Sequence, residues 1–196
     1  GPLAERPGFD QIAQGMGGLM SITGEPGRGP MRVGIPIADL CAGLFAAQAI
    51  FIALLERSKS GKGQWVQTSL LQAQAFMLDF QAARYLMDGD VPKQAGNNHP
   101  TSIPTGVFKT SDGFINLAVA GELIWKRLAE TLQKPEWCHD ERFAINESRS
   151  QNRDILNTEI EKITKTQTST YWVNKLNEAG VPAGDINDIG QVFESP

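Results

Sequence analysis

The 196-residue sequence predicts an α/β protein made of two parts. Apolar residues recur at helical spacing in both halves, and Asp112-Gly113 lies between two short apolar runs, which is typical of a β-hairpin. A cluster of Gly, Pro, Asn and Asp over residues 88–100 separates a Gly- and Ala-rich first half from a more charged second half. We therefore expect one domain over residues 1–90 and a small α+β domain over residues 91–196.

The first part is predicted to be mainly helical. Apolar periodicity indicates helices over residues 7–20, 37–58 and 70–87, the last ending at Asp88-Gly89. Alternating side chains in Gln64–Ser69 predict a strand between the second and third helices.

The second part is predicted to begin with the hairpin, whose strands are Gly106–Lys109 and Phe114–Ala118. Amphipathic helices follow, and their apolar faces should form the core of this part. Their ranges are 122–133, 146–164 and 169–179. The apolar positions that predict them are Ile124, Leu128, Leu132, Leu156, Ile160, Ile163, Trp172, Leu176 and Ala179.

Composition excludes several classes of function. The chain carries 18 Lys and Arg against 22 Asp and Glu, a net charge of −4, which argues against a nucleic-acid partner or a polybasic membrane anchor. Its two cysteines and two histidines lack metal-ligand spacing, so we expect no metal site. So few cysteines suit a reducing compartment.

The segment Ile35–Leu55 contains one charged residue, Asp39, and as a helix it would be roughly 31 Å long, enough to cross a bilayer. Its richness in Ala and Gly, and Gln48 near its middle, favour a helix buried in a large soluble core instead. We therefore expect no membrane partner.

Asp39 lies near the start of this helix and has two interpretations. A carboxylate there commonly caps the helix. Alternatively, it is a nucleophile that forms a covalent acyl intermediate, since Ala42, Gly43 and Ala46 share its helical face and leave room for a ligand. The spacing leaves both interpretations open.

A series of motifs runs through the whole chain in a specific order. They are Arg6-Pro7-Gly8-Phe9-Asp10, Gly17–Gly24, Val33–Leu40, Lys59–Gln64, Gly96–Pro100, Thr110–Gly113 and Ala179–Gly184. Together they resemble the central segment of the family III CoA-transferases. The resemblance implies a fragment of that fold: residues 1–90 as part of a Rossmann-like, CoA-binding large domain with a linking helix, and residues 91–196 as the small domain. It also implies an interlocked homodimer whose CoA contacts lie mostly outside this chain.

By this resemblance Asp39 matches the catalytic aspartate, which accepts an acyl group from an acyl-CoA before CoA passes to a carboxylic acid. The implied substrates are a CoA thioester donor and a small carboxylate acceptor, with no permanently bound cofactor. We expect a cytoplasmic enzyme, mitochondrial if eukaryotic, and expect the fragment alone to be inactive and aggregation-prone.

Residues Gly96, Asn97, Asn98 and His99 match a loop that shields the acyl intermediate in relatives. His99 is either a general base or a loop histidine that bonds its neighbours.

Two alternatives remain. The 2-methylacyl-CoA racemases of the same superfamily use the aspartate together with a histidine in a Gly-His-Asp motif. Here that motif reads Gly8-Phe9-Asp10, and Phe9 cannot exchange a proton, which favours the transferase. The other alternative is a CoA-binding or assembly module without chemistry.

Overall fold

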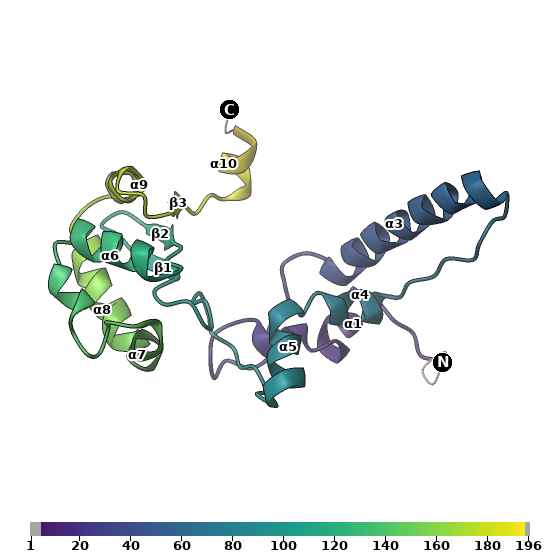
Figure 1. The fold of residues 1–196 in the computed structure, drawn as a ribbon, viewed down its shortest axis with the longest axis horizontal. Coiled ribbons are helices and arrows are strands. Elements are labelled where there is room, and N and C mark those ends of the chain that lie inside the picture. The colour runs from purple at the N-terminus through teal and green to yellow at the C-terminus, as the bar shows by residue number, and fades with distance from the viewer. Residues whose placement is uncertain (1–4, 195–196) are drawn as a thin grey trace. The chain divides into compact units, whose positions relative to one another are not determined.

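The computed structural model describes residues 5–194, which divide into two compact units between Gly96 and Asn97 (Figure 1). The sequence places this division after residue 90. The structure extends the first unit to Gly96 and begins the second at Asn97.

The first unit contains five helices within its described residues: α1 (Asp10–Met16), α2 (Leu19–Ile22), α3 (Ile37–Ser60), α4 (Leu70–Phe76) and α5 (Asp79–Asp88). The prediction of one continuous helix over residues 7–20 is wrong, because Gly18 adopts a left-handed conformation with φ of 83° and separates α1 from α2. The continuous helix over residues 70–87 is likewise wrong. The break lies at Met77 and Leu78, and Asp79, the first residue of α5, has a left-handed φ of 47°.

The predicted strand Gln64–Ser69 is also wrong. These residues form no strand, and Trp65 is 90% exposed. A strand requires a neighbour that pairs with its backbone groups, and the described part of the first unit offers none.

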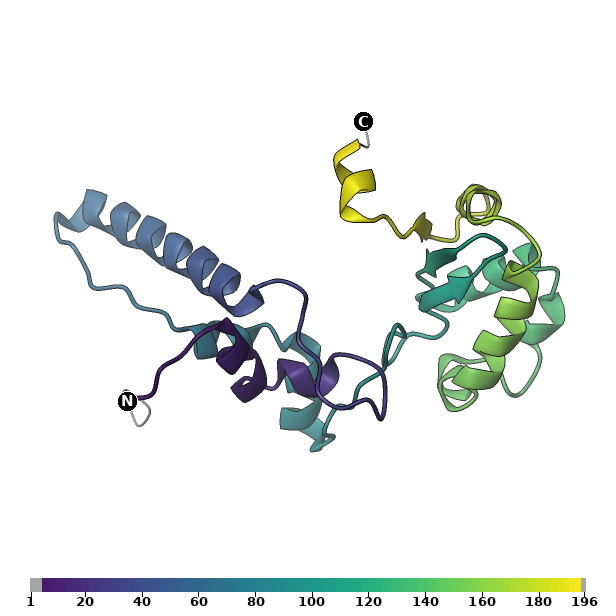
Figure 2. The ribbon, with the colours of Figure 1, turned by 180° about the vertical axis from the view of Figure 1, so that it is seen from behind.

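Helix α3 is confirmed and ends at Ser60. The next residue, Gly61, caps it, since its left-handed conformation lets its N–H bond to the carbonyl of Arg57. It is long and apolar enough to cross a membrane by length and composition. Its buried residues are Ala38, Cys41 and Ala42, all near its start, where α1 and α4 pack against it (Figures 1 and 2). The expected burial of the whole helix is therefore not provided by the described residues.

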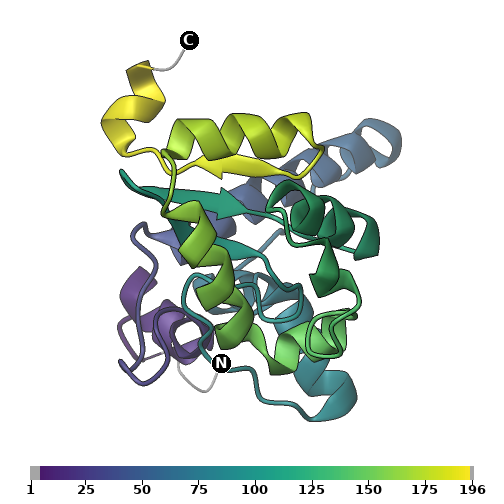
Figure 3. The ribbon, with the colours of Figure 1, turned by 90° about the vertical axis from the view of Figure 1, so that its left-hand side faces the viewer.

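The second unit is built on an antiparallel sheet with strand order β1-β2-β3 (Figure 3). Strands β1 (Gly106–Lys109) and β2 (Phe114–Leu117) form the predicted hairpin, in which Val107 pairs with Asn116. Strand β3 (Ala183–Asp185) was not predicted, because three residues are too few for an alternating pattern. The remaining elements are α6 (Glu122–Thr131), a 3-10 helix (Pro135–Cys138), α7 (Asn146–Gln151), α8 (Arg153–Thr164), α9 (Ser169–Glu178) and α10 (Ile189–Glu194). The predicted continuous helix over residues 146–164 is wrong, because the backbone of Asn152 leaves the helical conformation and separates α7 from α8.

The core of the second unit joins the sheet to its helices. Six of the predicted apolar positions are buried, each at most 4% exposed: Leu128, Leu132, Leu156, Ile160, Trp172 and Leu176. Ile124, Ile163 and Ala179 are only partly buried. The six buried residues pack with Phe108, Ile115 and Leu117 of the hairpin. This unit therefore has an apolar interior of its own.

Candidate active site

Asp39 is the third residue of α3 and is exposed. Within residues 5–194 its carboxylate makes no hydrogen bond or ion pair. The helix begins after Pro36, which provides no side-chain cap. The capping interpretation of Asp39 therefore does not hold in this structure, and both carboxylate oxygens remain available to a ligand.

Another carboxylate performs the capping. Asp10, from α1, is 7% exposed, and its Oδ1 accepts a hydrogen bond of 2.8 Å from the backbone N–H of Ala38. Ala38 lies in the first turn of α3, where backbone N–H groups have no partner within the helix. A negative charge at this end is also favoured by the helix dipole.

Gln14 holds the segment that leads into α3. It lies one turn after Asp10 on α1 and is fully buried. Its Nε2 donates to Asp10 Oδ2 at 2.7 Å and to the carbonyl of Ile35 at 3.3 Å, and its Oε1 accepts from the N–H of Val33 at 3.0 Å. Arg32 lies 3.8 Å from Asp10 Oδ2 with a half-exposed side chain.

The small residues beside Asp39 have different surroundings. Ala42 is buried and packs with Cys41 and Ala73, so it serves helix packing. A Cβ placed on Gly43 would meet no atom within 4 Å. The predicted room for a ligand beside Asp39 is therefore found at Gly43, one turn later in the helix, and not at Ala42.

The predicted substrate loop spans the division between the units. Gly96 belongs to the first unit, where its N–H donates to the carbonyl of Gly24 at 3.0 Å. Asn97, Asn98 and His99 belong to the second. The Nδ1 of His99 lies 3.2 Å and 3.0 Å from the backbone nitrogens of Thr101 and Ser102 and accepts from both. His99 therefore bonds residues of its own loop.

A row of polar side chains on α7 and α8 fixes residues 98–103. From α8, Asn157 donates to Asn98 Oδ1 at 2.8 Å and Arg153 donates to the carbonyl of Pro100 at 3.0 Å. From α7, Asn146 donates to the carbonyl of Thr101 at 2.9 Å and Arg149 donates to that of Ile103 at 2.8 Å. Asn146 and Arg149 are three residues apart on α7, and Arg153 and Asn157 are four apart on α8, so each pair lies on one side of its helix. Sequence reasoning missed this row because it followed the apolar side of the same segment.

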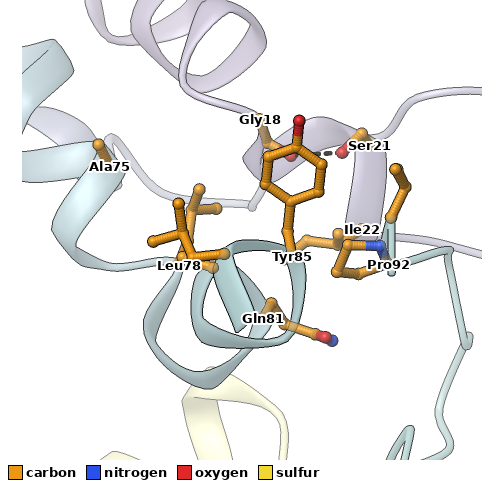
Figure 4. A pocket seen from close by; sticks show the side chains of 11 residues that line it. Gly18, Ser21, Ile22, Ala75, Leu78, Gln81, Tyr85 and Pro92 are labelled. Atoms are coloured by element: carbon orange, nitrogen blue, oxygen red, sulfur yellow. Dashed lines mark hydrogen bonds between the residues drawn. The ribbon is translucent and has the colours of Figure 1, made fainter. Parts of the chain in front are cut away.

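A cavity of about 620 Å³ lies in the first unit between α2 and α5 (Figure 4). Leu78, Tyr85 and Pro92 contribute to its largely apolar lining, and Ser21 Oγ there donates to the carbonyl of Gly18. None of the predicted site residues lines this cavity. Between residues 5 and 194 there is also no group of three side chains suited to a metal ion.

Comparison with known proteins extends over the whole chain. The chain is 38% identical over 200 residues to the succinate–glutarate CoA-transferase of Agrobacterium fabrum, covering 100% of this chain and 49% of that protein. It is 33% identical to the acetyl-CoA:oxalate CoA-transferase of Acetobacter aceti, covering 100% of this chain and 51% of that protein. It is 32% identical to the human succinyl-CoA:glutarate CoA-transferase, with 100% and 45% covered. The chain thus spans about half the length of these curated relatives.

Solved structures also match the whole chain and are likewise about twice its length. A CAIB/BAIF family protein from Brucella suis matches with a TM-score of 0.84 and 40% identity, covering 100% of this chain and 52% of that chain. The Mycobacterium tuberculosis protein Rv3272 matches with a TM-score of 0.85 and 27% identity over the same shares. The family model for CoA-transferase family III matches residues 1–196. The chain therefore belongs to CoA-transferase family III.

Proposed function

We propose that the protein containing this chain transfers CoA from an acyl-CoA to a carboxylic acid, with Asp39 as the nucleophile. The observation that carries this proposal is the exposed carboxylate of Asp39, which has no partner among residues 5–194, at a helix start that Asp10 already caps. A carboxylate whose oxygens are not engaged in structure can attack an acyl carbon. Family membership supports CoA transfer as the overall reaction.

In the proposed reaction, an Asp39 oxygen attacks the thioester carbonyl carbon, the C–S bond breaks and CoA leaves as a thiolate. The product is a mixed anhydride. The thiolate then attacks the Asp39 carbonyl carbon, which releases the donor's carboxylate and forms an aspartyl-CoA thioester. The acceptor carboxylate attacks that carbon and again expels the thiolate. The thiolate finally attacks the acceptor's acyl carbon, so that the new acyl-CoA forms and Asp39 is restored.

The surroundings of Asp39 suit this chemistry. A carboxylate is a weak nucleophile, so the reaction depends on close positioning and on keeping water from the anhydride. Leu40 and Leu44, 50% and 65% exposed, provide apolar surface beside it, and Gly43 leaves space for a thioester to approach. Those apolar surfaces would exclude water once a ligand or another part of the protein covers them.

We propose that other parts of the protein, together with a second copy of the chain, cover α3. The exposed apolar residues of α3 and α5 include Leu44, Phe51, Ile52, Leu55, Leu86 and Met87. Exposed apolar surface of this extent is typical of an interface. We also propose that Asn97–His99 contact the substrate, as the family resemblance implies. On this proposal, residues 1–196 alone would be inactive.

The test is a transfer assay on the intact enzyme with succinyl-CoA as donor and glutarate, oxalate and mesaconate as acceptors, since the names of relatives contain these compounds. Asp39→Asn should lower kcat on the order of a thousandfold or more, as loss of a nucleophile does. Asp88→Asn, at an exposed position on α5, is the matched control and should keep full activity. Deuterium exchange at the α-carbon of a 2-methylacyl-CoA without any transfer would indicate the racemase alternative instead.

A further inference from the structure

Asp10 and Gln14 are buried polar residues to which the proposed chemistry assigns no role. Asp10 is 7% exposed and Gln14 is 0% exposed, although both side chains come from a short surface helix of seven residues. Burying a carboxylate and an amide is costly unless their hydrogen bonds are satisfied. Here they are satisfied by one target, the segment that leads into α3.

The hydrogen bonds bracket that segment at both ends. Gln14 Oε1 accepts from the N–H of Val33 and its Nε2 donates to the carbonyl of Ile35, while Asp10 Oδ1 accepts from the N–H of Ala38. The hydrogen bond between Gln14 and Asp10 Oδ2, at 2.7 Å, joins the two side chains into one unit. The backbone is therefore fixed on either side of Pro36.

The last of these contacts is one residue before Asp39. A shift of Ala38 would move the Cα of Asp39 with it, because the two share a peptide plane. Pro36 provides no cap of its own, so without Asp10 the N–H of Ala38 would lose its partner. The first turn would keep the hydrogen bond from the N–H of Leu40 to the carbonyl of Pro36 but would no longer be anchored to α1 through Asp10.

We propose that Asp10 and Gln14 are positioning residues that hold the Asp39 carboxylate in its attacking geometry. The inference rests on the proposed function of Asp39 and deepens it. A misplacement of about 1 Å costs up to about a hundredfold in rate when a reaction depends on near-attack geometry. Binding of the CoA portion does not depend on this geometry, so loss of the contacts should affect the chemical step and leave substrate binding intact.

The experiment compares variants of the intact enzyme by kcat and by KM for succinyl-CoA. Asp10→Ala should lower kcat by about 10- to 100-fold and change KM by no more than about twofold. Asp10→Asn should cause a smaller fall, because the amide oxygen still accepts from Ala38 but the amide nitrogen opposes Gln14 Nε2. Gln11→Ala, at an exposed position on the same helix, is the matched control and should match wild type.

A double variant separates positioning from general damage. In Asp10→Asn combined with Gln14→Glu, the new amide at position 10 donates to the new carboxylate at position 14, so this contact is restored and the net charge is unchanged, although the hydrogen bond from position 14 to the carbonyl of Ile35 is lost. We expect this variant to recover part of the kcat lost in Asp10→Asn, because the contact with position 10 is restored while that with Ile35 is not. Circular dichroism and thermal melting identify the variants that fold, and Asp10→Asn decides the question if Asp10→Ala does not fold.

The two proposals fail in different ways. A folded Asp10→Asn with wild-type kcat, or one whose KM rises as much as its kcat falls, would overturn the positioning role and leave the function of Asp39 intact. A wild-type enzyme without transfer activity, or an Asp39→Asn variant with full activity, would instead remove the proposed function. Equal kcat in Asp10→Asn and the double variant would also count against the pairing of Asp10 with Gln14.

Discussion

The Nδ2 of Asn157 on α8 donates a hydrogen bond of 2.8 Å to Oδ1 of Asn98, in the loop that the sequence assigns to the substrate. The loop crosses close to the sheet at this point, since a Cβ on Gly106 would lie 2.8 Å from the carbonyl oxygen of Asn97. The start of the loop in the second unit is thus fixed by a side chain nearly sixty residues later in the chain.

We predict that Asn157→Ala loosens this loop. Loss of one such hydrogen bond should lower the stability of the second unit by about 1 kcal/mol. Amide hydrogen exchange over residues 98–103 should become faster, while exchange in β2 stays near wild type. Asn174→Ala, at an exposed position on α9, should change neither, and unchanged exchange in Asn157→Ala would contradict the anchoring role.

Leu156 should be essential to the second unit. It is 0% exposed in the core, so Leu156→Ala should lower the free energy of unfolding by about 2–5 kcal/mol through lost burial and a cavity. The measurement is urea unfolding followed by the fluorescence of Trp125, Trp137 and Trp172. Leu123→Ala removes a side chain that is 63% exposed and should cost no more than about 0.5 kcal/mol. Equal losses in the two variants would show that the core is wrongly placed.

Gln74 on α4 should be replaceable by an apolar residue. Its side chain is 0% exposed, and neither its Nε2 nor its Oε1 has a hydrogen-bond partner within residues 5–194. Gln74→Met should therefore raise stability by about 1 kcal/mol or more, because a buried unpaired amide is costly. Calorimetry of the intact enzyme measures the effect, with Gln72→Met at an exposed position as control. A lower melting temperature for Gln74→Met would reveal a partner for the amide elsewhere in the protein.

Asp112 should make the second unit less stable in acid. The backbone N–H of Ser169, followed by the hydroxyls of Thr110 and Ser169, holds the pKa of Asp112 below its usual value. A lowered folded-state pKa contributes stability above the unfolded pKa of about 4, and this contribution is lost as the pH falls through the folded value. Asp112→Asn should therefore lose less stability than wild type on acidification from pH 7 to below about pH 4. The control Glu178→Gln should lose as much stability as wild type over the same pH range. If Asp112→Asn and wild type lose equal stability on acidification, the prediction is wrong.

The sequence predicted the second unit better than the first. Leu156, Ile160 and Trp172 obey helical periodicity because the residues that cover them belong to the same compact unit. In the first unit, periodicity missed the breaks at Gly18 and just before Asp79, two left-handed residues within an apolar pattern that continues through both helices. Pattern alone does not report such local conformations.

For the candidate site, the sequence identified Asp39 but not the residues that support it. An Asp at the start of an apolar helix is conspicuous, because charges are rare there. Asp10 and Gln14 are polar residues in a seven-residue helix, and only the structure shows that they are buried against Val33–Ala38. A polar pair spaced by four residues was the available signal, but the same spacing occurs on exposed helices.

The most direct test of Asp39 as the acyl carrier is chemical trapping. The intact enzyme is incubated with succinyl-CoA, quenched with hydroxylamine, digested and mapped by mass spectrometry. Hydroxylamine converts an activated aspartyl carboxyl group to a hydroxamate, so the modified residue marks the intermediate. We expect a hydroxamate on Asp39 that forms only with the acyl-CoA. A hydroxamate on another carboxylate, or none on an enzyme that turns over, would contradict the account.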